Sequence, residues 1–205
     1  MIARAVRLVL VLCLALSATG WRPAFAEGGL RVFLMGDSFA VGMAPFVAAD
    51  LTKATVGGNA SFRWESLDGV DRATRVVIVL GTNDSLDHGE DGAANYIHRV
   101  RIVARGLAKR AAEVIWVGPP CILPGHRALD DRRVEDTHDR IAEAIESLSE
   151  RNVRYVGLRD FTTRGGACLE DHRTEDQVHF TARGYRRLVD HVRMAADLAD
   201  WRARR

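Results

Sequence analysis

The stretch VVIVLGTND, residues 76–84, decides the fold class of this chain. It opens with five consecutive apolar residues, four of them β-branched. Such a run fits a strand that is buried on both faces, because a strand with one exposed face would carry polar residues at alternate positions. Strands of this kind belong to parallel sheets that are covered by helices on both sides. Gly81 ends the run, and three polar residues follow it.

Similar strand-like segments alternate with helix-like segments along the rest of the chain. Helices are indicated where apolar residues recur at spacings of three and four. Strands are expected at residues 30–35, 55–56, 76–80, 114–117 and 153–156, and helices at 40–51, 92–111, 131–150 and 181–200. Thr181 is expected to cap the last helix. This alternation predicts an α/β domain with one parallel sheet between two helical layers.

The residues that directly follow the strands are the first candidates for a functional site, since ligands bind beyond the carboxyl ends of parallel strands. Ser38 follows the first strand, Asn83 follows the central strand, and Asp176 and His179 lie just before the last helix. A serine hydroxyl needs a neighbouring base to act as a nucleophile. Histidine can be that base, and a carboxylate can orient the histidine. The sequence therefore predicts a Ser-His-Asp site.

Three segments resemble the SGNH/GDSL hydrolase family. Residues 36–38 (GDS) look like its block I, residues 81–84 (GTND) like block III and residues 176–179 (DQVH) like block V. The resemblance extends from about residue 30 to about residue 192. It implies a flavodoxin-like three-layer α/β/α sandwich with a five-stranded parallel sheet, and no metal or other cofactor.

The same resemblance implies a role for each candidate residue. Ser38 would be the nucleophile, His179 the base and Asp176 its orienting acid. The expected donors to an oxyanion are the Ser38 N–H, the Asn83 side chain and a backbone N–H of block II.

Block II falls at residues 56–61, where Gly58 is the preferred donor. Ala60 is the alternative, because the family often places a small residue shortly before a serine or threonine. Asp37 and Gly81 are expected to support the turns that carry Ser38 and Asn83. Phe62 and Trp64 follow block II and either line an acyl or sugar pocket or pack onto the core.

Residues 1–26 differ from the rest of the chain. Arg4 and Arg7 precede a short apolar run, and the segment ends in Ala24-Phe25-Ala26. This layout predicts a secretory signal peptide followed by one hydrolase domain over residues 27–205, with an uncleaved anchor as the alternative. We therefore expect a periplasmic or secreted protein that is not inserted in the membrane after cleavage. Without residues 1–26 the chain has 26 basic and 27 acidic residues, which does not indicate a nucleic-acid partner.

Export would place the two remaining cysteines, Cys121 and Cys168, in an oxidising compartment. A disulfide between them is the expectation, and two separate thiols are the alternative. The sequence contains no HExxH motif, Walker A loop or GxGxxG motif, and the other six histidines share no spacing typical of metal ligands.

The sequence as a whole predicts an exported serine esterase that cleaves carboxylic esters through an acyl-serine intermediate. Short acyl groups, such as those of acetylated glycans, are the favoured substrates. Two alternatives remain open: transfer of an acyl group to an envelope sugar, and a non-catalytic glycan-binding module on the same scaffold.

Overall fold

A five-stranded parallel sheet forms the centre of the protein in the computed structural model, which describes residues 29–60, 67–86 and 92–196. The strands are β1 (Arg31–Gly36), β2 (Leu51–Ala54), β3 (Thr74–Val79), β4 (Glu113–Gly118) and β5 (Val153–Gly157). Their order in the sheet is β2-β1-β3-β4-β5, with every neighbouring pair parallel. This is the flavodoxin-like order. The predicted fold class is therefore confirmed.

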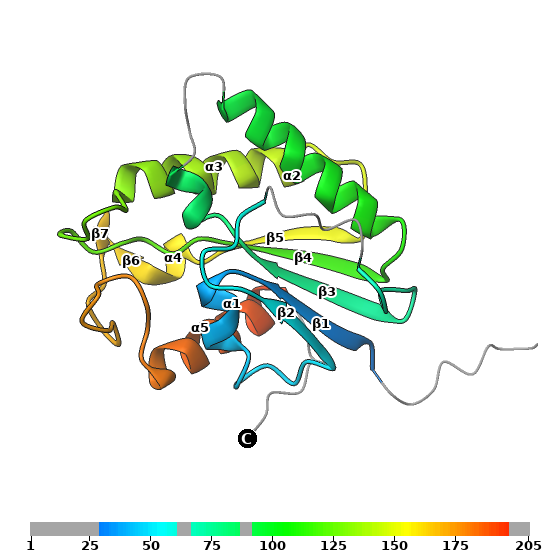
Figure 1. The fold of residues 1–205 in the computed structure, drawn as a ribbon, viewed down its shortest axis with the longest axis horizontal. Coiled ribbons are helices and arrows are strands. Elements are labelled where there is room, and N and C mark those ends of the chain that lie inside the picture. The colour runs from blue at the N-terminus through cyan, green and yellow to red at the C-terminus, as the bar shows by residue number, and fades with distance from the viewer. Residues whose placement is uncertain (1–28, 61–66, 87–91, 197–205) are drawn as a thin grey trace, which may run out of the picture.

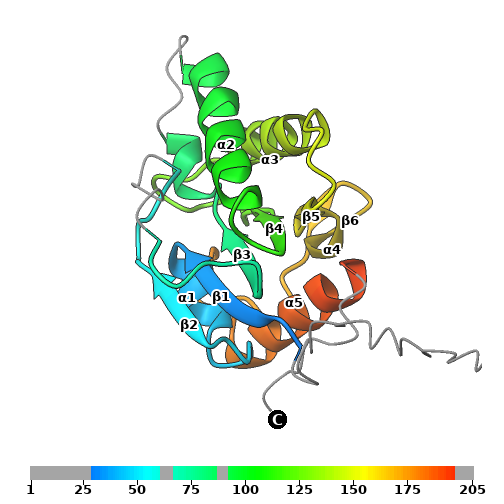
Figure 2. The same ribbon diagram turned by 90° about the vertical axis from the view of Figure 1, so that its right-hand side faces the viewer.

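Helices cover both faces of this sheet (Figures 1 and 2). One face carries α1 (Ser38–Met43) and α5 (Ala182–Ala195), and the other carries α2 (Gly92–Ala108) and α3 (Asp131–Glu146). Shorter elements complete the fold: the 3-10 helix η2 (Asn83–Leu86), α4 (Arg159–Thr162), and a hairpin of β6 (Thr163–Arg164) and β7 (Ala167–Cys168). Within the described ranges, no helix combines the length and hydropathy needed to cross a bilayer.

The central strand β3 is apolar throughout because it contributes to two cores. All six of its residues are buried. Val77 and Val79 pack into the core beneath α1 and α5, whereas Val76 and Ile78 pack into the core beneath α2 and α3. Alternate residues of a strand point to opposite faces, so a strand covered on both faces needs apolar residues at every position.

Two expected boundaries are wrong near the first helix. The helix expected over residues 40–51 begins at Ser38 and ends at Met43, and the strand expected at residues 55–56 instead spans Leu51–Ala54. Pro45 explains the early end, because proline has no N–H to continue the helical hydrogen bonds. The helices expected over residues 92–111 and 131–150 also end early, at Ala108 and Glu146. The last helix begins at Ala182, with Thr181 as its N-cap, as expected.

The helices α1 and α5 pack closely against each other at Gly42. A Cβ atom placed on Gly42 would lie only 2.1 Å from Cζ of Tyr185. Tyr185 is itself buried, and its ring packs against Phe39 with 6.4 Å between the ring centroids. The absence of a side chain at Gly42 therefore allows the helix that begins at Ser38 to pack directly on α5.

We predict that Gly42→Ala destabilises the protein by about 1–3 kcal/mol, because the added methyl group overpacks the contact with Tyr185. The matched control is Gly106→Ala in α2, where a Cβ atom would have no neighbour within 4 Å. This control should stabilise the protein by about 0.5–1 kcal/mol, since alanine loses less backbone entropy than glycine in a helix. Urea unfolding measures both. An increase in stability for Gly42→Ala would contradict the close packing.

Candidate active site

Ser38 lies just beyond the carboxyl end of β1, as the first residue of α1. The turn before it is tied to β3, since the Asp37 N–H donates to the Val79 carbonyl at 3.1 Å. Gly36 makes this approach possible, because a Cβ atom at that position would lie 2.1 Å from the Val79 oxygen. Ser38 thus sits between β1 and β3. In this strand order, that is where the chain switches direction and where ligands bind.

The three side chains expected to form the triad meet at this edge of the sheet. Nε2 of His179 lies 2.8 Å from Oγ of Ser38, and Nδ1 of His179 lies 2.5 Å from Oδ2 of Asp176. A carboxylate can only accept a hydrogen bond, so Nδ1 carries the proton and Nε2 is left to accept the Ser38 hydroxyl. This arrangement can move a proton from the serine to the imidazole.

A short hairpin over residues 172–181 carries both Asp176 and His179. Two backbone hydrogen bonds close it: the Thr181 N–H donates to the His172 carbonyl at 2.7 Å, and the Thr174 N–H donates to the His179 carbonyl at 3.0 Å. At the tip, Gln177 has a φ of 64°, a backbone conformation that tight turns use. The hairpin therefore fixes Asp176 and His179 relative to each other.

Asp176 is held in its ionised form. Partial burial favours the neutral acid, but the hydrogen bonds to the carboxylate outweigh it and hold the pKa of Asp176 well below its ordinary value. Oδ1 accepts the Thr174 hydroxyl at 2.6 Å and the backbone N–H groups of Val178 and His179 at 3.0 and 2.9 Å. At neutral pH the histidine therefore faces a full negative charge.

Asp37 is held in a different state from Asp176. It is 1% exposed, and burial raises the pKa of its carboxyl to about 8, against the opposing effect of the Phe39 N–H and with a further rise from nearby Asp84. Oδ1 of Asp37 accepts the Phe39 N–H at 2.9 Å and so caps α1. The structure therefore places Asp37 as a support of the serine turn.

Gly58 links the Asn83 side chain to the turn that carries Ser38. Its side-chain amide donates to the Gly58 carbonyl at 3.0 Å, and a Cβ atom on Gly58 would lie 3.5 Å from Cα of Asp37. An asparagine amide has two N–H groups, so one is used to orient the side chain and the other remains for a substrate.

The two candidate donors of block II are both engaged in this structure. The Gly58 N–H donates to the Thr55 carbonyl at 3.0 Å, and the Ala60 N–H donates to the buried Asp84 carboxylate at 2.7 Å. Neither N–H can reach a substrate oxygen without giving up its present partner. Donation by the Gly58 N–H to an oxyanion therefore stays a prediction. In this structure, Gly58 contributes a carbonyl that holds Asn83.

Gly81 supports the turn between β3 and Asn83. Its φ is 134°, and a Cβ atom would lie 2.8 Å from both Cδ of Pro119 and Cδ1 of Ile141. A larger residue would push the Asn83 segment away from the loop after β4. Phe62 and Trp64, expected near the pocket, lie outside the described residues.

The structure joins Cys121 and Cys168 in a disulfide, with their Cα atoms 5.8 Å apart. The bridge connects the segment after β4 to β7, which precedes the hairpin of residues 172–181. It closes a loop with a sequence separation of 47. In the chain-entropy model, a crosslink across a loop of this length contributes up to about 4 kcal/mol to stability.

A hollow of about 600 Å³ lies beside the same hairpin. Leu123 lines it, and the Leu123 N–H donates to the carbonyl of Gln177 at the hairpin tip at 3.2 Å. Charged and polar side chains make up part of its wall, namely His126, Asp130, Asp131, Arg132 and Glu170. In the part of the chain that is described, no group of three or more His, Cys, Asp or Glu residues could hold a metal ion.

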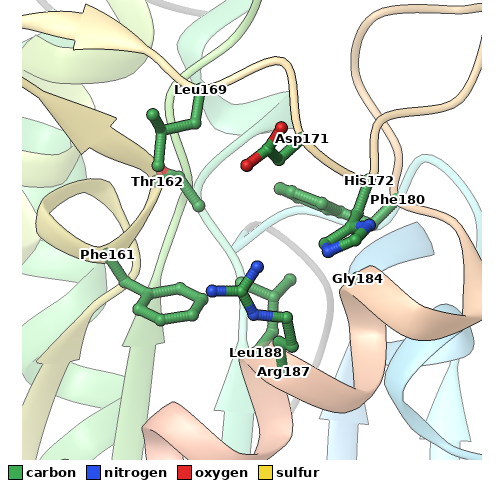
Figure 3. A pocket seen from close by; sticks show the side chains of 9 residues that line it. All are labelled: Phe161, Thr162, Leu169, Asp171, His172, Phe180, Gly184, Arg187 and Leu188. Carbon is green, nitrogen blue, oxygen red and sulfur yellow. The ribbon is translucent and has the colours of Figure 1, made fainter.

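A second, much smaller cavity of about 30 Å³ lies where the hairpin meets α5 (Figure 3). Its lining includes His172 and Phe180 of the hairpin and Gly184 of α5. A Cβ atom on Gly184 would lie 2.8 Å from Cβ of Phe180 and 2.9 Å from Cβ of His172. The absence of a side chain at Gly184 therefore lets the hairpin pack directly on α5.

Two residues of this hairpin were not predicted from the sequence. Thr174 bonds the Asp176 carboxylate, and a hydroxyl two residues from an aspartate in a turn is a signal that could have found it. Arg173 donates to the Val178 carbonyl and to the Cys121 carbonyl, both at 2.7 Å. No sequence pattern marks Arg173, because its partners are backbone atoms, one of them 52 residues away.

Solved structures with a similar fold come from several bacteria. A lipase/acylhydrolase from Enterococcus faecalis is 17% identical with a TM-score of 0.64, covering 86% of this chain and 100% of that one. An acetylxylan esterase from Geobacillus stearothermophilus is 17% identical with a TM-score of 0.59, covering 86% and 98%. A GDSL-like lipase from Bacteroides thetaiotaomicron is 20% identical with a TM-score of 0.63, covering 82% and 88%.

At these identities, the structural similarity shows the shared fold. A comparison with curated protein sequences found no match. The model of the GDSL-like lipase/acylhydrolase family, in contrast, matches residues 20–187 and so includes the Ser38, Asn83 and His179 segments. The resemblance seen in the sequence is confirmed, and the chain belongs to the GDSL-like lipase/acylhydrolase family.

Proposed function

We propose that this protein is a serine esterase that hydrolyses carboxylic esters through an acyl-serine intermediate. The observation that carries the proposal is the continuous hydrogen-bonded chain from Ser38 through His179 to Asp176 in a member of a hydrolase family. A serine placed this way has both the base it needs and a carboxylate that orients that base.

The reaction proceeds in two halves. Oγ of Ser38 attacks the ester carbonyl while Nε2 of His179 takes the hydroxyl proton, and the protonated imidazole then gives that proton to the departing alcohol. In the second half, His179 takes a proton from water, the hydroxide attacks the acyl-serine, and the proton returns to Ser38 as the acid leaves. Asp176 stays ionised throughout and stabilises the imidazolium.

The oxyanion formed in each half needs hydrogen-bond donors that are already in place. The Ser38 N–H is at the first position of a helix, where a backbone N–H has no helical carbonyl to bind. The N–H of Asn83 that does not bind Gly58 is the second donor. Loss of one such donor typically slows a reaction of this kind by about 10²–10³-fold.

Short acyl groups on a polar alcohol, such as an acetylated sugar, are the substrates we favour. The similar fold of an acetylxylan esterase agrees with such a substrate.

We predict that Ser38→Ala and His179→Ala each lower kcat for p-nitrophenyl acetate by about 10⁴–10⁶-fold, because the members of a triad act as a unit. The control is His98→Asn, since His98 is exposed on α2 and should leave kcat unchanged. Equal rates for the wild type and Ser38→Ala would show that the serine is not the nucleophile.

The same assay with longer acyl esters and with acetylated oligosaccharides shows which acyl chain length and which alcohol the protein prefers. We expect kcat/KM to fall as the acyl chain lengthens. An added sugar acceptor that diverts the acyl group from water would favour a transferase over a hydrolase.

We predict that Thr174→Val lowers the free energy of unfolding at pH 7 by about 1 kcal/mol, because it removes the hydrogen bond from the hydroxyl to the Asp176 carboxylate. The expected effect is small for a hydrogen bond to a charged group, since Asp176 is nearly half exposed. The lost hydroxyl stabilises the carboxylate, so the pKa of Asp176 moves up towards its ordinary value. The low native pKa of Asp176 contributes stability above the unfolded pKa of about 4, which is lost at lower pH. Because the unfolded state titrates in the same way in both proteins, the deficit of the variant should shrink only as the pH falls through the native pKa of its Asp176, well below pH 4. Thr174→Ser keeps the hydroxyl and is the control for urea unfolding across this range.

We also propose that residues 1–26 direct export and are removed. The amino-acid pattern of that segment supports this, and a disulfide is a common feature of exported proteins. We predict that the protein recovered from the periplasm or the medium begins at Glu27, as determined by N-terminal sequencing. Ala26→Leu should block cleavage, because the peptidase requires a small residue there. Export of the variant with normal cleavage would contradict the assigned site.

A further inference from the structure

Arg173 is a partly buried cation that the mechanism above does not use. Its guanidinium donates to the Val178 carbonyl and to the Cys121 carbonyl, both at 2.7 Å, with a longer bond of 3.4 Å to the Leu169 carbonyl. The guanidinium carbon also lies 3.9 Å from the centroid of the Phe180 ring. The Arg173 side chain thus contacts Val178 and Phe180, which are the two neighbours of His179 in the sequence. It also contacts Cys121 in the segment after β4.

The two short hydrogen bonds of Arg173 link the hairpin that carries His179 to the segment after β4. The Val178 carbonyl belongs to the peptide bond that leads into His179, so its orientation helps to set where the imidazole points. Cys121 is fully buried in the segment that directly follows β4 of the sheet. The guanidinium therefore ties the peptide of the histidine to the body of the fold.

The charge on Arg173 strengthens this tie. Burial lowers the pKa of Arg173 to about 10, with Asp131 and Asp176 opposing the change, so the side chain remains protonated at neutral pH. Hydrogen bonds from a charged donor are stronger than those between neutral groups. The planar guanidinium group can also donate to two carbonyls while its face stacks on an aromatic ring. The single ammonium group of a lysine cannot do both.

Other contacts keep the hairpin attached without Arg173. The Leu123 N–H donates to the Gln177 carbonyl, the Thr181 N–H donates to the His172 carbonyl, and the disulfide of Cys121 anchors the preceding strand. Loss of the guanidinium should therefore change the alignment of His179 more than the attachment of the hairpin.

We infer that Arg173 is a positioning residue for the ester hydrolysis proposed above, holding the peptide before His179 so that Nε2 stays within hydrogen-bond distance of the Ser38 hydroxyl. This inference rests on the proposed function. Arg173 does not touch the reacting atoms, so its effect should appear in kcat and not in substrate binding.

The test compares Arg173→Met, Arg173→Lys and a matched control. The control is Arg187→Met, because Arg187 also lies over an aromatic ring, that of Phe161 at 5.7 Å, but is exposed and lies on α5 (Figure 3). Measurements are kcat and KM for p-nitrophenyl acetate, the rate at which a fluorophosphonate modifies Ser38, and the melting temperature, which confirms that each variant is folded in the assay.

For Arg173→Met we expect kcat and the rate of serine modification to fall together by about 10- to 100-fold, with KM changed less than about twofold, because small misplacements of a catalytic group cost this much. Arg173→Lys should recover part of the loss, and Arg187→Met should match the wild type. A folded Arg173→Met with wild-type kcat, or a loss that appears only in KM, would overturn the inference.

Two further outcomes are also decisive. If Arg173→Met does not fold, Arg173→Lys decides: a folded protein with kcat lowered by about threefold or more supports positioning, and wild-type kcat overturns it. Ser38→Ala, assayed alongside, separates this inference from the proposed function. Activity that survives in Ser38→Ala defeats the proposed function itself. Activity that is lost there but intact in Arg173→Met defeats only the role of Arg173.

Discussion

Burial of β3 on both faces is the constraint on which the rest of the structure depends. Each large apolar side chain removed from water contributes about 1.5–3 kcal/mol, and β3 divides its side chains between two cores. Helices must therefore cover both faces of the sheet. With the strand order β2-β1-β3-β4-β5, this places the switch in chain direction between β1 and β3, which is where Ser38 lies.

Close backbone contacts connect the parts of the site to one another. Gly36 lets the serine turn approach β3, Gly42 lets α1 pack on Tyr185 of α5, and Gly184 lets the start of α5 pack on the hairpin that carries His179. Ser38 and His179 are 141 positions apart in the sequence. Ser38 is the first residue of α1, and His179 lies just before the start of α5, which packs on α1. The distance between nucleophile and base is thus set by helix packing and not by the loop alone.

Much of this arrangement could be predicted from the sequence, since buried strands and strand ends leave clear local patterns. Four of the five strands, the parallel sheet and the meeting of Ser38, His179 and Asp176 all depend on such patterns. The end of α1 was missed because tertiary contacts, together with Pro45, override a helical pattern that continues past it. The contact of Arg173 with Cys121 was not predictable, because its partner is a backbone carbonyl 52 residues away in the sequence.

Environment, more than residue type, separates the two aspartates next to the reacting groups. Asp37 is adjacent to the nucleophile but buried, and burial raises its pKa to about 8. Asp176 is far away in the sequence and nearly half exposed, yet three hydrogen bonds to one of its oxygens keep it ionised. Only an ionised carboxylate can stabilise an imidazolium, and an aspartate held neutral can cap a helix without adding a negative charge beside the attacking oxygen. The ionised Asp176, bonded to Nδ1 of His179, therefore favours transfer of the Ser38 proton to Nε2 of His179.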